Sequence, residues 1–248
     1  MGLNRYYVPN LPKAGSVLLP AEESHHALRV RREMEGGFCV AFDGKGNRAN
    51  CKIVRTTKRD VTIEIESFCF EPNELPGKIL LAVAMPKGDR QKGVIEKAVE
   101  LGVHELIPLI CHRSVAIPSE SSAEKWARIV IEACKQCERN RNMVIASPCS
   151  FESLIQFHSS NSQLHMIAHP QSESEPSNTT ACLYNPIEAS YSEALIAIGP
   201  EGGFTEKEVQ FADDSKWLRL DLGSRILRVE TAVCAALFYA GLRVKNNA

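Results

Sequence analysis

The chain has 248 residues, 44% hydrophobic and 24% charged, which suits a protein that buries the core of one large domain or two modest ones. Its formal net charge of −1 gives no global attraction to a polyanion, so any nucleic-acid surface has to be local. The longest uncharged apolar run, residues 231–242, is far shorter than the roughly 20 residues of a membrane span. Nine cysteines without a signal peptide predict a reduced, cytoplasmic protein.

The first part of the chain is predicted to be mostly β. Short β-rich runs at residues 5–8, 37–42, 49–54 and 61–67 predict strands, and Asp43-Gly-Lys-Gly-Asn47 is a hairpin signal because these residues tolerate positive φ. One short helix is predicted over residues 22–31, after Pro20. Two prolines and a glycine at residues 71–77 then break the pattern. We therefore predict one domain over residues 1–72 and a second over residues 73–248.

The second part alternates strand and helix patterns. We predict strands at residues 78–85, 105–110, 164–168, 194–198 and 217–222, and helices at residues 90–101, 121–140, 206–212 and 230–242. Residues 171–180 are polar and predict a loop. This alternation is typical of an α/β domain with a mostly parallel sheet covered on both faces.

The only CxxC pair, Cys134 and Cys137, lies inside a predicted helix and has no second ligand pair to complete a zinc site. We therefore predict no metal.

One glycine-rich segment, Gly199-Pro-Glu-Gly-Gly203, follows a predicted strand and precedes a predicted helix. Thr205 and Glu208 have the spacing of a capping box at the start of that helix. Gly202 and Gly203 would let a ligand approach the backbone, whereas Pro200 stiffens the turn. The spacing is neither that of a dinucleotide fingerprint nor that of a phosphate loop. A tight strand-to-helix turn explains the segment equally well.

A second segment, Leu222-Gly-Ser-Arg-Ile-Leu-Arg-Val-Glu-Thr-Ala232, also follows a predicted strand. It places Arg225 and Arg228 in the region where parallel sheets bind ligands. The alternative is that these arginines cap helix carbonyls or pair with Glu230.

These two segments closely resemble signatures of the RsmE family, bacterial 16S ribosomal RNA uridine-N3 methyltransferases of the SPOUT superfamily. Other segments agree in order, including Arg5-Tyr-Tyr, Glu96-Lys-Ala-Val-Glu-Leu-Gly102, Glu132-Ala-Cys-Lys-Gln-Cys-Glu-Arg-Asn-Arg141 and His169-Pro170. The resemblance implies a PUA-like β-barrel for RNA, followed by a SPOUT α/β domain with a C-terminal trefoil knot. It also implies a homodimer that binds S-adenosylmethionine and 16S rRNA of the small ribosomal subunit, with uracil 1498 as the family's target.

The resemblance assigns the cofactor to three loops. Matching the family motifs onto this sequence gives these cofactor-binding residues: Ala168, His169, Pro170, Gly199, Pro200, Glu201, Gly202, Gly203, Leu222, Gly223, Ile226 and Leu227. Backbone groups are expected to dominate there, with the apolar side chains around the adenine ring.

Methylation of uracil N3 requires an in-line approach and loss of the imino proton. Arg228 is the predicted catalytic cation, because it stays charged and offers directional donors to a uracil carbonyl. Glu201 is predicted to orient the substrate or accept the proton. RNA contacts are predicted from Arg5, from a cluster after Pro20 and from the second domain. The cluster is His25, His26, Arg29, Arg31 and Arg32, and the second domain adds Lys87, Arg90 and Arg113. A solvated helix face is the alternative for Arg31 and Arg32, and a packed side chain is the alternative for His26.

Two other functions stay open. The chain could be a SPOUT methyltransferase acting on another RNA position or on a ribose 2′-hydroxyl. It could also be an RNA-binding assembly factor without activity, although such a protein has no need of a cofactor loop. A nucleotide-dependent hydrolase is disfavoured because the chain lacks a phosphate-loop lysine.

Overall fold

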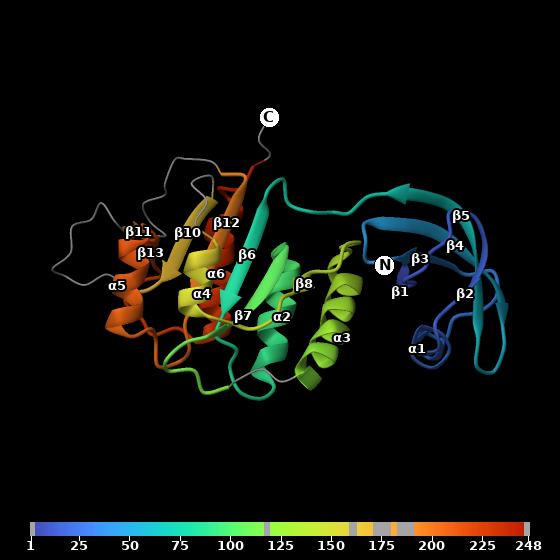
Figure 1. Cartoon of the computed structure of the whole chain (residues 1–248). Coiled ribbons are helices and arrows are strands. Elements are labelled where there is room, and N and C mark those ends of the chain that lie inside the picture. Colours follow the sequence, from blue (N-terminus) through green and yellow to red (C-terminus); the bar gives the residue numbers. More distant parts are fainter. Residues whose placement is uncertain (1–2, 117–119, 159–162, 171–179, 183–190, 246–248) are drawn as a thin grey trace. The chain divides into compact units, whose positions relative to one another are not determined.

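A computed structural model describes residues 3–116, 120–158, 163–170, 180–182 and 191–245 (Figure 1). The chain divides into two compact units. The first comprises Met1–Glu74 together with Ile131–Asn142, and the second comprises Leu75–Val130 and Met143–Ala248. The first unit therefore contains a segment that comes much later in the sequence than its strands.

The first unit is built on one mixed sheet in the order β1-β3-β4-β5-β2. These strands are β1 Asn4–Tyr7, β2 Gly15–Leu18, β3 Phe38–Phe42, β4 Asn47–Thr56 and β5 Val61–Phe70. Strand β1 pairs with β3 in parallel, and the other pairs are antiparallel. Alternate residues of β3, β4 and β5, such as Ile53 and Ile63, are fully buried in its core. The predicted strands are confirmed, whereas β2 was not predicted.

The hairpin predicted at residues 43–47 is confirmed between β3 and β4. The Asp43 carboxylate accepts the N–H groups of Lys45 and Asn47, at 2.7 and 3.1 Å from Oδ1. Gly44 and Gly46 have φ of +73° and +108°, which is why glycine suits these positions.

The helix predicted at residues 22–31 has two parts, the α-helix α1 Ala21–His25 and the π-helix η1 His26–Arg31. Pro20 precedes α1 as its N-cap residue, where a missing N–H costs nothing. The π-helix ends at Arg32, which adopts a left-handed conformation with φ of +55°. The sequence predicted the helix but gave no signal for its wider π turn.

Within the described residues, the second unit forms an eight-stranded sheet in the order β11-β13-β10-β12-β6-β7-β8, with β9 beside β7. All its pairs are parallel, as predicted. The strands are β6 Lys78–Val83, β7 Glu105–Ile110, β8 Val144–Ile145, β9 Cys149–Ser150, β10 Gln163–Ala168, β11 Thr180–Cys182, β12 Glu193–Ile198 and β13 Leu218–Asp221.

The short strands β8, β9 and β11 were not predicted. The loop predicted at residues 171–180 lies outside the described residues except for Thr180, which begins β11.

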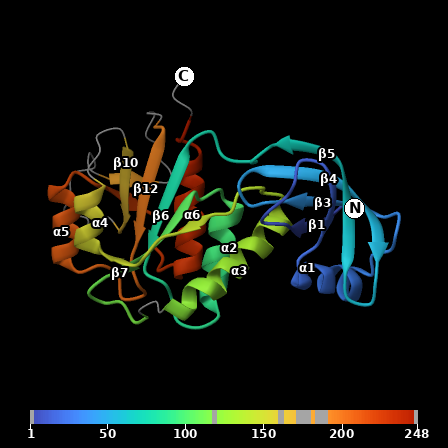
Figure 2. The ribbon, with the colours of Figure 1, turned by 45° about the vertical axis from the view of Figure 1, so that its right-hand side comes forward.

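Helices cover both faces of this sheet (Figure 2). They are α2 Arg90–Glu100, α4 Phe151–Phe157, α5 Glu206–Asp214 and α6 Val229–Gly241. A further helix, α3 Glu120–Cys137, begins in the second unit and ends in the segment 131–142 of the first. Helix α6 packs on α2, β6 and β12, whereas α4 packs on α5. Because strand side chains alternate, Leu80 and Ala82 of β6 face α4 and α5, and Leu81 is buried on the other face. The predicted helices are confirmed, and α4 was not predicted.

Candidate functional site

Three adjacent parallel strands, β13, β10 and β12, end at one edge of the sheet. The loops that follow them enclose a pocket, at the position where parallel sheets bind ligands. Its lining is Ala168, His169, Pro170, Ile198, Gly199, Pro200, Glu201, Gly203, Phe204, Leu220, Asp221, Leu222, Gly223, Arg225, Ile226, Leu227, Val229 and Ala232. Loops from three distant parts of the chain therefore build one site.

The pocket brings together every residue expected to bind the cofactor except Gly202. Sequence reasoning left out Asp221, which ends β13 and lines the pocket, and Phe204, which is almost fully buried. The signal for Asp221 was its place at the carboxyl end of a predicted strand. The sequence does not distinguish Phe204 from an ordinary core residue, and Phe204 also packs on Phe151, with ring centroids 5.0 Å apart.

The glycine loop, residues 199–204, is a tight turn followed directly by a capped helix. The Gly203 N–H donates to the Pro200 carbonyl at 2.8 Å, and Gly203 has φ of +68°. The predicted capping box at the start of α5 is confirmed: Thr205 Oγ1 accepts the Glu208 N–H, and Glu208 Oε2 accepts the Thr205 N–H at 2.7 Å. The turn and the cap fix the loop at both of its ends.

Gly202 faces away from the pocket, toward Arg113. A Cβ atom on Gly202 would lie 3.4 Å from Cδ of Arg113. The Arg113 Nη1 group donates to the Gly202 carbonyl at 2.8 Å and to the Phe204 carbonyl at 3.4 Å. Arg113 was predicted to contact RNA, and in the structure its guanidinium is hydrogen-bonded to the glycine loop. Gly202 is the one residue expected to bind the cofactor that does not line the pocket.

Glu208 ties the same loop to the segment after β7. Its Oε1 accepts the His112 N–H at 2.9 Å, while Oε2 is held by Thr205. Burial raises the pKa of Glu208, but the hydrogen bonds from Thr205 and His112 outweigh burial and hold the pKa below its ordinary value. The ionised carboxylate is therefore part of the folded structure.

Glu201, the predicted proton acceptor, forms an ion pair with Arg90, at 2.8 Å between Oε1 and Nη2. Both side chains are partly exposed, at 35% and 42%. Arg90 was predicted as an RNA contact and Glu201 as a catalytic group, and the structure brings these two together. Glu201 thus lines the pocket with a carboxylate that is already paired with a cation.

The arginine loop, residues 222–228, makes fewer side-chain hydrogen bonds to the rest of the described protein than the glycine loop does. Arg225 lines the pocket, and both Arg225 and Arg228 are exposed. Arg228 is the N-cap residue of α6, where its carbonyl accepts the N–H groups of Thr231 and Ala232. Ile226 is fully exposed although it lines the pocket. The alternative in which Arg228 pairs with Glu230 is not seen, because no ion pair joins them among the described residues.

In the first unit, Arg5 is also committed to the protein. Its Nη2 donates to Asn140 Oδ1 at 2.5 Å, and the guanidinium stacks 5.1 Å from the centroid of the Phe42 ring. The hydrogen bond to Asn140 connects β1 to the segment 131–142 of the same unit. We therefore do not retain Arg5 among the proposed RNA contacts.

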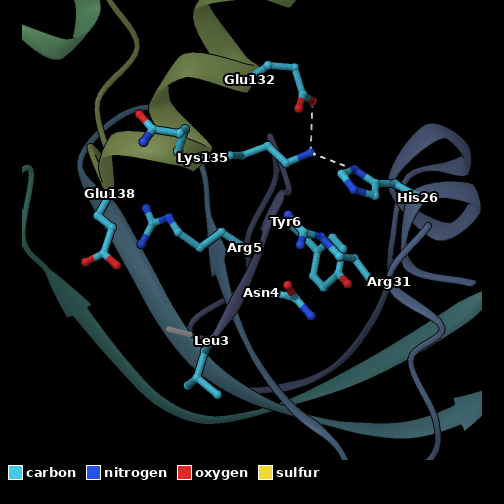
Figure 3. A pocket seen from close by; sticks show the side chains of 10 residues that line it. Leu3, Asn4, Arg5, Tyr6, His26, Arg31, Glu132, Lys135 and Glu138 are labelled. Carbon is cyan, nitrogen blue, oxygen red and sulfur yellow. Dashed lines mark hydrogen bonds and ion pairs between the residues drawn. The ribbon is translucent and has the colours of Figure 1, made fainter. Parts of the chain in front are cut away.

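A recess in the first unit is lined by Arg5, Arg31, His26 and Lys135 (Figure 3). Lys135 Nζ donates to the Glu23 carboxylate at 3.0 Å and to Glu132 at 2.9 Å, so its charge is balanced. Burial and the neighbouring Lys135 lower the pKa of His26, which favours a neutral ring and a packed His26.

Every arginine and lysine predicted to contact RNA except Arg5 is exposed. Within the described residues, Arg29, Arg31 and Arg32 of the first unit and Lys87 after β6 make no ion pair.

The described residues contain no group of three or more His, Cys, Asp or Glu side chains placed to hold a metal ion. No described helix combines the length and apolar character needed to cross a membrane.

Comparison with known proteins defines the class first. Residues 73–240 match the RNA methyltransferase domain, and residues 19–66 match the RNA methyltransferase PUA domain. The chain is 31% identical over 243 residues to ribosomal RNA small subunit methyltransferase E of Bacillus subtilis, covering 95% of this chain and 94% of that relative.

Two solved structures agree with this match. A methyltransferase of Legionella pneumophila with bound S-adenosylmethionine has a TM-score of 0.86 at 30% identity and covers 98% of both chains. The small subunit methyltransferase E of Neisseria gonorrhoeae, bound to S-adenosyl methionine, has a TM-score of 0.84 at 30% identity and covers 96% of both chains. The chain belongs to the ribosomal RNA small subunit methyltransferase E family.

Proposed function

We propose that this protein transfers a methyl group from S-adenosylmethionine to N3 of a uridine in the 16S rRNA of the small ribosomal subunit. The observation that carries the proposal is the pocket formed by the loops after β10, β12 and β13. The family and the two relatives solved with the cofactor support the same site.

The residues of the pocket fit this cofactor. The turns at Gly199–Gly203 and Gly223 bring backbone close to a ligand, and Leu222, Ile226 and Leu227 offer an apolar surface for an adenine ring. The carboxylates of Asp221 and Glu201 add negative charge, which complements the positive sulfonium. When bound there, S-adenosylmethionine supplies an electrophilic methyl group.

Arg228 is the proposed catalytic cation. Loss of the N3 proton leaves negative charge on the uracil ring and its carbonyl oxygens, and a guanidinium stabilises that charge by directional hydrogen bonds. The exposed Arg228 side chain lies at the start of α6, as the last residue of the arginine loop. Its backbone is fixed by the helix cap while its guanidinium is available to a substrate.

Glu201 is the proposed residue that orients the uracil or accepts its proton. Its carboxylate lines the pocket and is held by Arg90 at 2.8 Å, so we assign Glu201 mainly to substrate orientation.

We propose that Arg29, Arg31, Arg32 and Lys87 contact the RNA. These exposed cations would bind phosphates and position the RNA, whereas the choice of uridine comes from the pocket.

Three finer features of the family are also proposed for this chain. The first feature is that the mixed sheet of the first unit closes into a PUA-like barrel. The second is that the C-terminal part of the second unit, including the arginine loop, forms a trefoil knot. A homodimer is the third feature. Its support is apolar surface left uncovered on the second unit, at Ile226, Phe238 and Leu242, which are 101%, 63% and 63% exposed. The expected location is the cytoplasm, where ribosomal subunits are found.

The test is methyl transfer from labelled S-adenosylmethionine to small ribosomal subunits that lack the modification, followed by nucleoside mass spectrometry. We expect a single 3-methyluridine. A methylated ribose or another methylated base would retain the fold and cofactor but overturn the substrate. Cofactor binding without transfer to subunits or to naked RNA would point to another RNA as the substrate. No transfer and no cofactor binding would favour the inactive assembly factor.

A further inference from the structure

The glycine loop separates the cofactor pocket from Arg113. Residues 199, 200, 201, 203 and 204 line the pocket, and Gly202 does not. Where Gly202 lacks a side chain, the methylene groups of Arg113 cover the backbone at 3.4 to 3.5 Å from the position of a Cβ. Arg113 therefore contacts the loop at the one residue, Gly202, that does not line the pocket.

The contact from Arg113 is polar as well as steric. Its Nη1 group bonds the carbonyls of both Gly202 and Phe204, so one cation holds two peptide groups on either side of Gly203. Gly203 is the residue with φ of +68°, a conformation that glycine enters at little cost but also leaves easily. A guanidinium is suited to this task because its donors are fixed in one plane.

A second hydrogen bond also joins the segment after β7 to the region of the glycine loop, this time through a side chain of α5. Arg113 reaches from the segment after β7 to the glycine loop, while the Glu208 carboxylate reaches from α5 back to the His112 N–H. Strands β7 and β12 are not neighbours, because β6 lies between them. The loop is thus supported by an element that contributes no residue to the pocket lining.

We propose that Arg113 is a positioning residue that holds the glycine loop in the shape that binds S-adenosylmethionine. This inference rests on the proposed function, because it names a residue that prepares the same site. It also gives Arg113 a role different from an RNA contact. Loss of Arg113 raises the free energy of ordering the loop, which the cofactor then has to supply on binding.

The test compares Arg113→Met, which keeps the methylene cover over Gly202 but removes the donors, with Arg113→Lys, which keeps one donor group. Lys92→Met is the matched control, because it removes one positive charge from an exposed residue of α2. Calorimetry gives the Kd for S-adenosylmethionine, and methyl transfer to small subunits gives KM and kcat. Thermal unfolding checks that each variant is folded.

Arg113→Met is expected to raise Kd and the KM for S-adenosylmethionine by about fivefold to tenfold, as for a lost hydrogen bond from a charged donor, with kcat within about twofold. Arg113→Lys should recover part of the affinity, and Lys92→Met should leave it unchanged. Unchanged cofactor affinity with weaker RNA binding in Arg113→Met would overturn the inference. If the unaltered chain binds no S-adenosylmethionine, the proposed function fails and this inference fails with it.

Discussion

The two loops that face each other across the pocket are built differently. The glycine loop is held by a turn, by a capping box and by Arg113. In the arginine loop, the one side-chain hydrogen bond within the described residues joins the Gly223 N–H to Asp221 at 2.8 Å, and residues 224–226 and 228 are exposed. One wall of the pocket is therefore formed in advance, whereas the other has groups free to contact a ligand, the RNA or a second subunit.

The largest effect is expected at the exposed wall. Arg228→Ala should lower kcat for methyl transfer by about a hundredfold to a thousandfold, the usual loss for one group that stabilises transition-state charge. Affinity for S-adenosylmethionine should stay nearly unchanged, because the Arg228 side chain does not line the pocket. Single-turnover methyl transfer and calorimetry measure the two quantities. Normal turnover would remove Arg228 from the catalytic role.

A matched pair of glycines tests the difference between the loops directly. Gly203 and Gly223 both have positive φ, +68° and +101°, and no atom lies within 4 Å of an added Cβ at either position. Alanine strains the left-handed backbone by roughly 1–2 kcal/mol. The held glycine loop carries this strain with or without cofactor, so Gly203→Ala should lower the free energy of unfolding and leave cofactor affinity nearly unchanged. The less constrained arginine loop can relax when empty, so Gly223→Ala should weaken cofactor binding by about tenfold. Equal losses would show that the two loops are equally rigid.

The carboxylate that supports the glycine loop gives a pH-dependent test. The pKa of Glu208 lies below its ordinary value of 4.5, so its stabilisation is complete above that pH and is lost as pH falls through the folded-state pKa. Glu208→Gln should lower the free energy of unfolding by about 1–2 kcal/mol at pH 7, the scale of a charged hydrogen bond. Urea unfolding at several pH values should show the gap between wild type and variant closing in acid. A gap independent of pH would contradict the assignment.

The smallest effect is expected from a cation outside both loops. Lys87→Met should weaken RNA binding a few-fold and reduce its salt dependence by about one phosphate contact, while cofactor affinity stays unchanged. Filter binding at several salt concentrations measures this. An unchanged salt slope would exclude Lys87 from the RNA contacts.

Local patterns in the sequence predicted most of the elements. The hairpin at Asp43 and the capping box at Thr205 were recognisable because each is made by residues a few positions apart. Strands such as β8 and β11 are too short to show a period, and they form because a neighbouring strand offers its edge.

The candidate site was predicted less completely, for a related reason. The glycine loop and the arginine loop were identifiable because their glycines and arginines follow strand patterns, whereas residues 168–170 were assigned by the family resemblance. The partners of Arg113 and Arg90 were not identifiable, since Gly202 lies 89 residues from Arg113 and a charged side chain near a strand end reads equally well as an RNA contact. Which side chains pair between segments far apart in the sequence can be known only from the folded structure.

The most direct test of the account is to map the cofactor onto the 15 glycines of the chain by selective ¹⁵N-glycine labelling and NMR titration with S-adenosylmethionine. The account predicts large shifts at Gly199, Gly203 and Gly223, which line the pocket, and none at Gly15, Gly36 or Gly44 in the first unit. Shifts confined to the first unit, or unchanged signals from the three pocket glycines at saturating cofactor, would contradict the placement of the site at the ends of β10, β12 and β13.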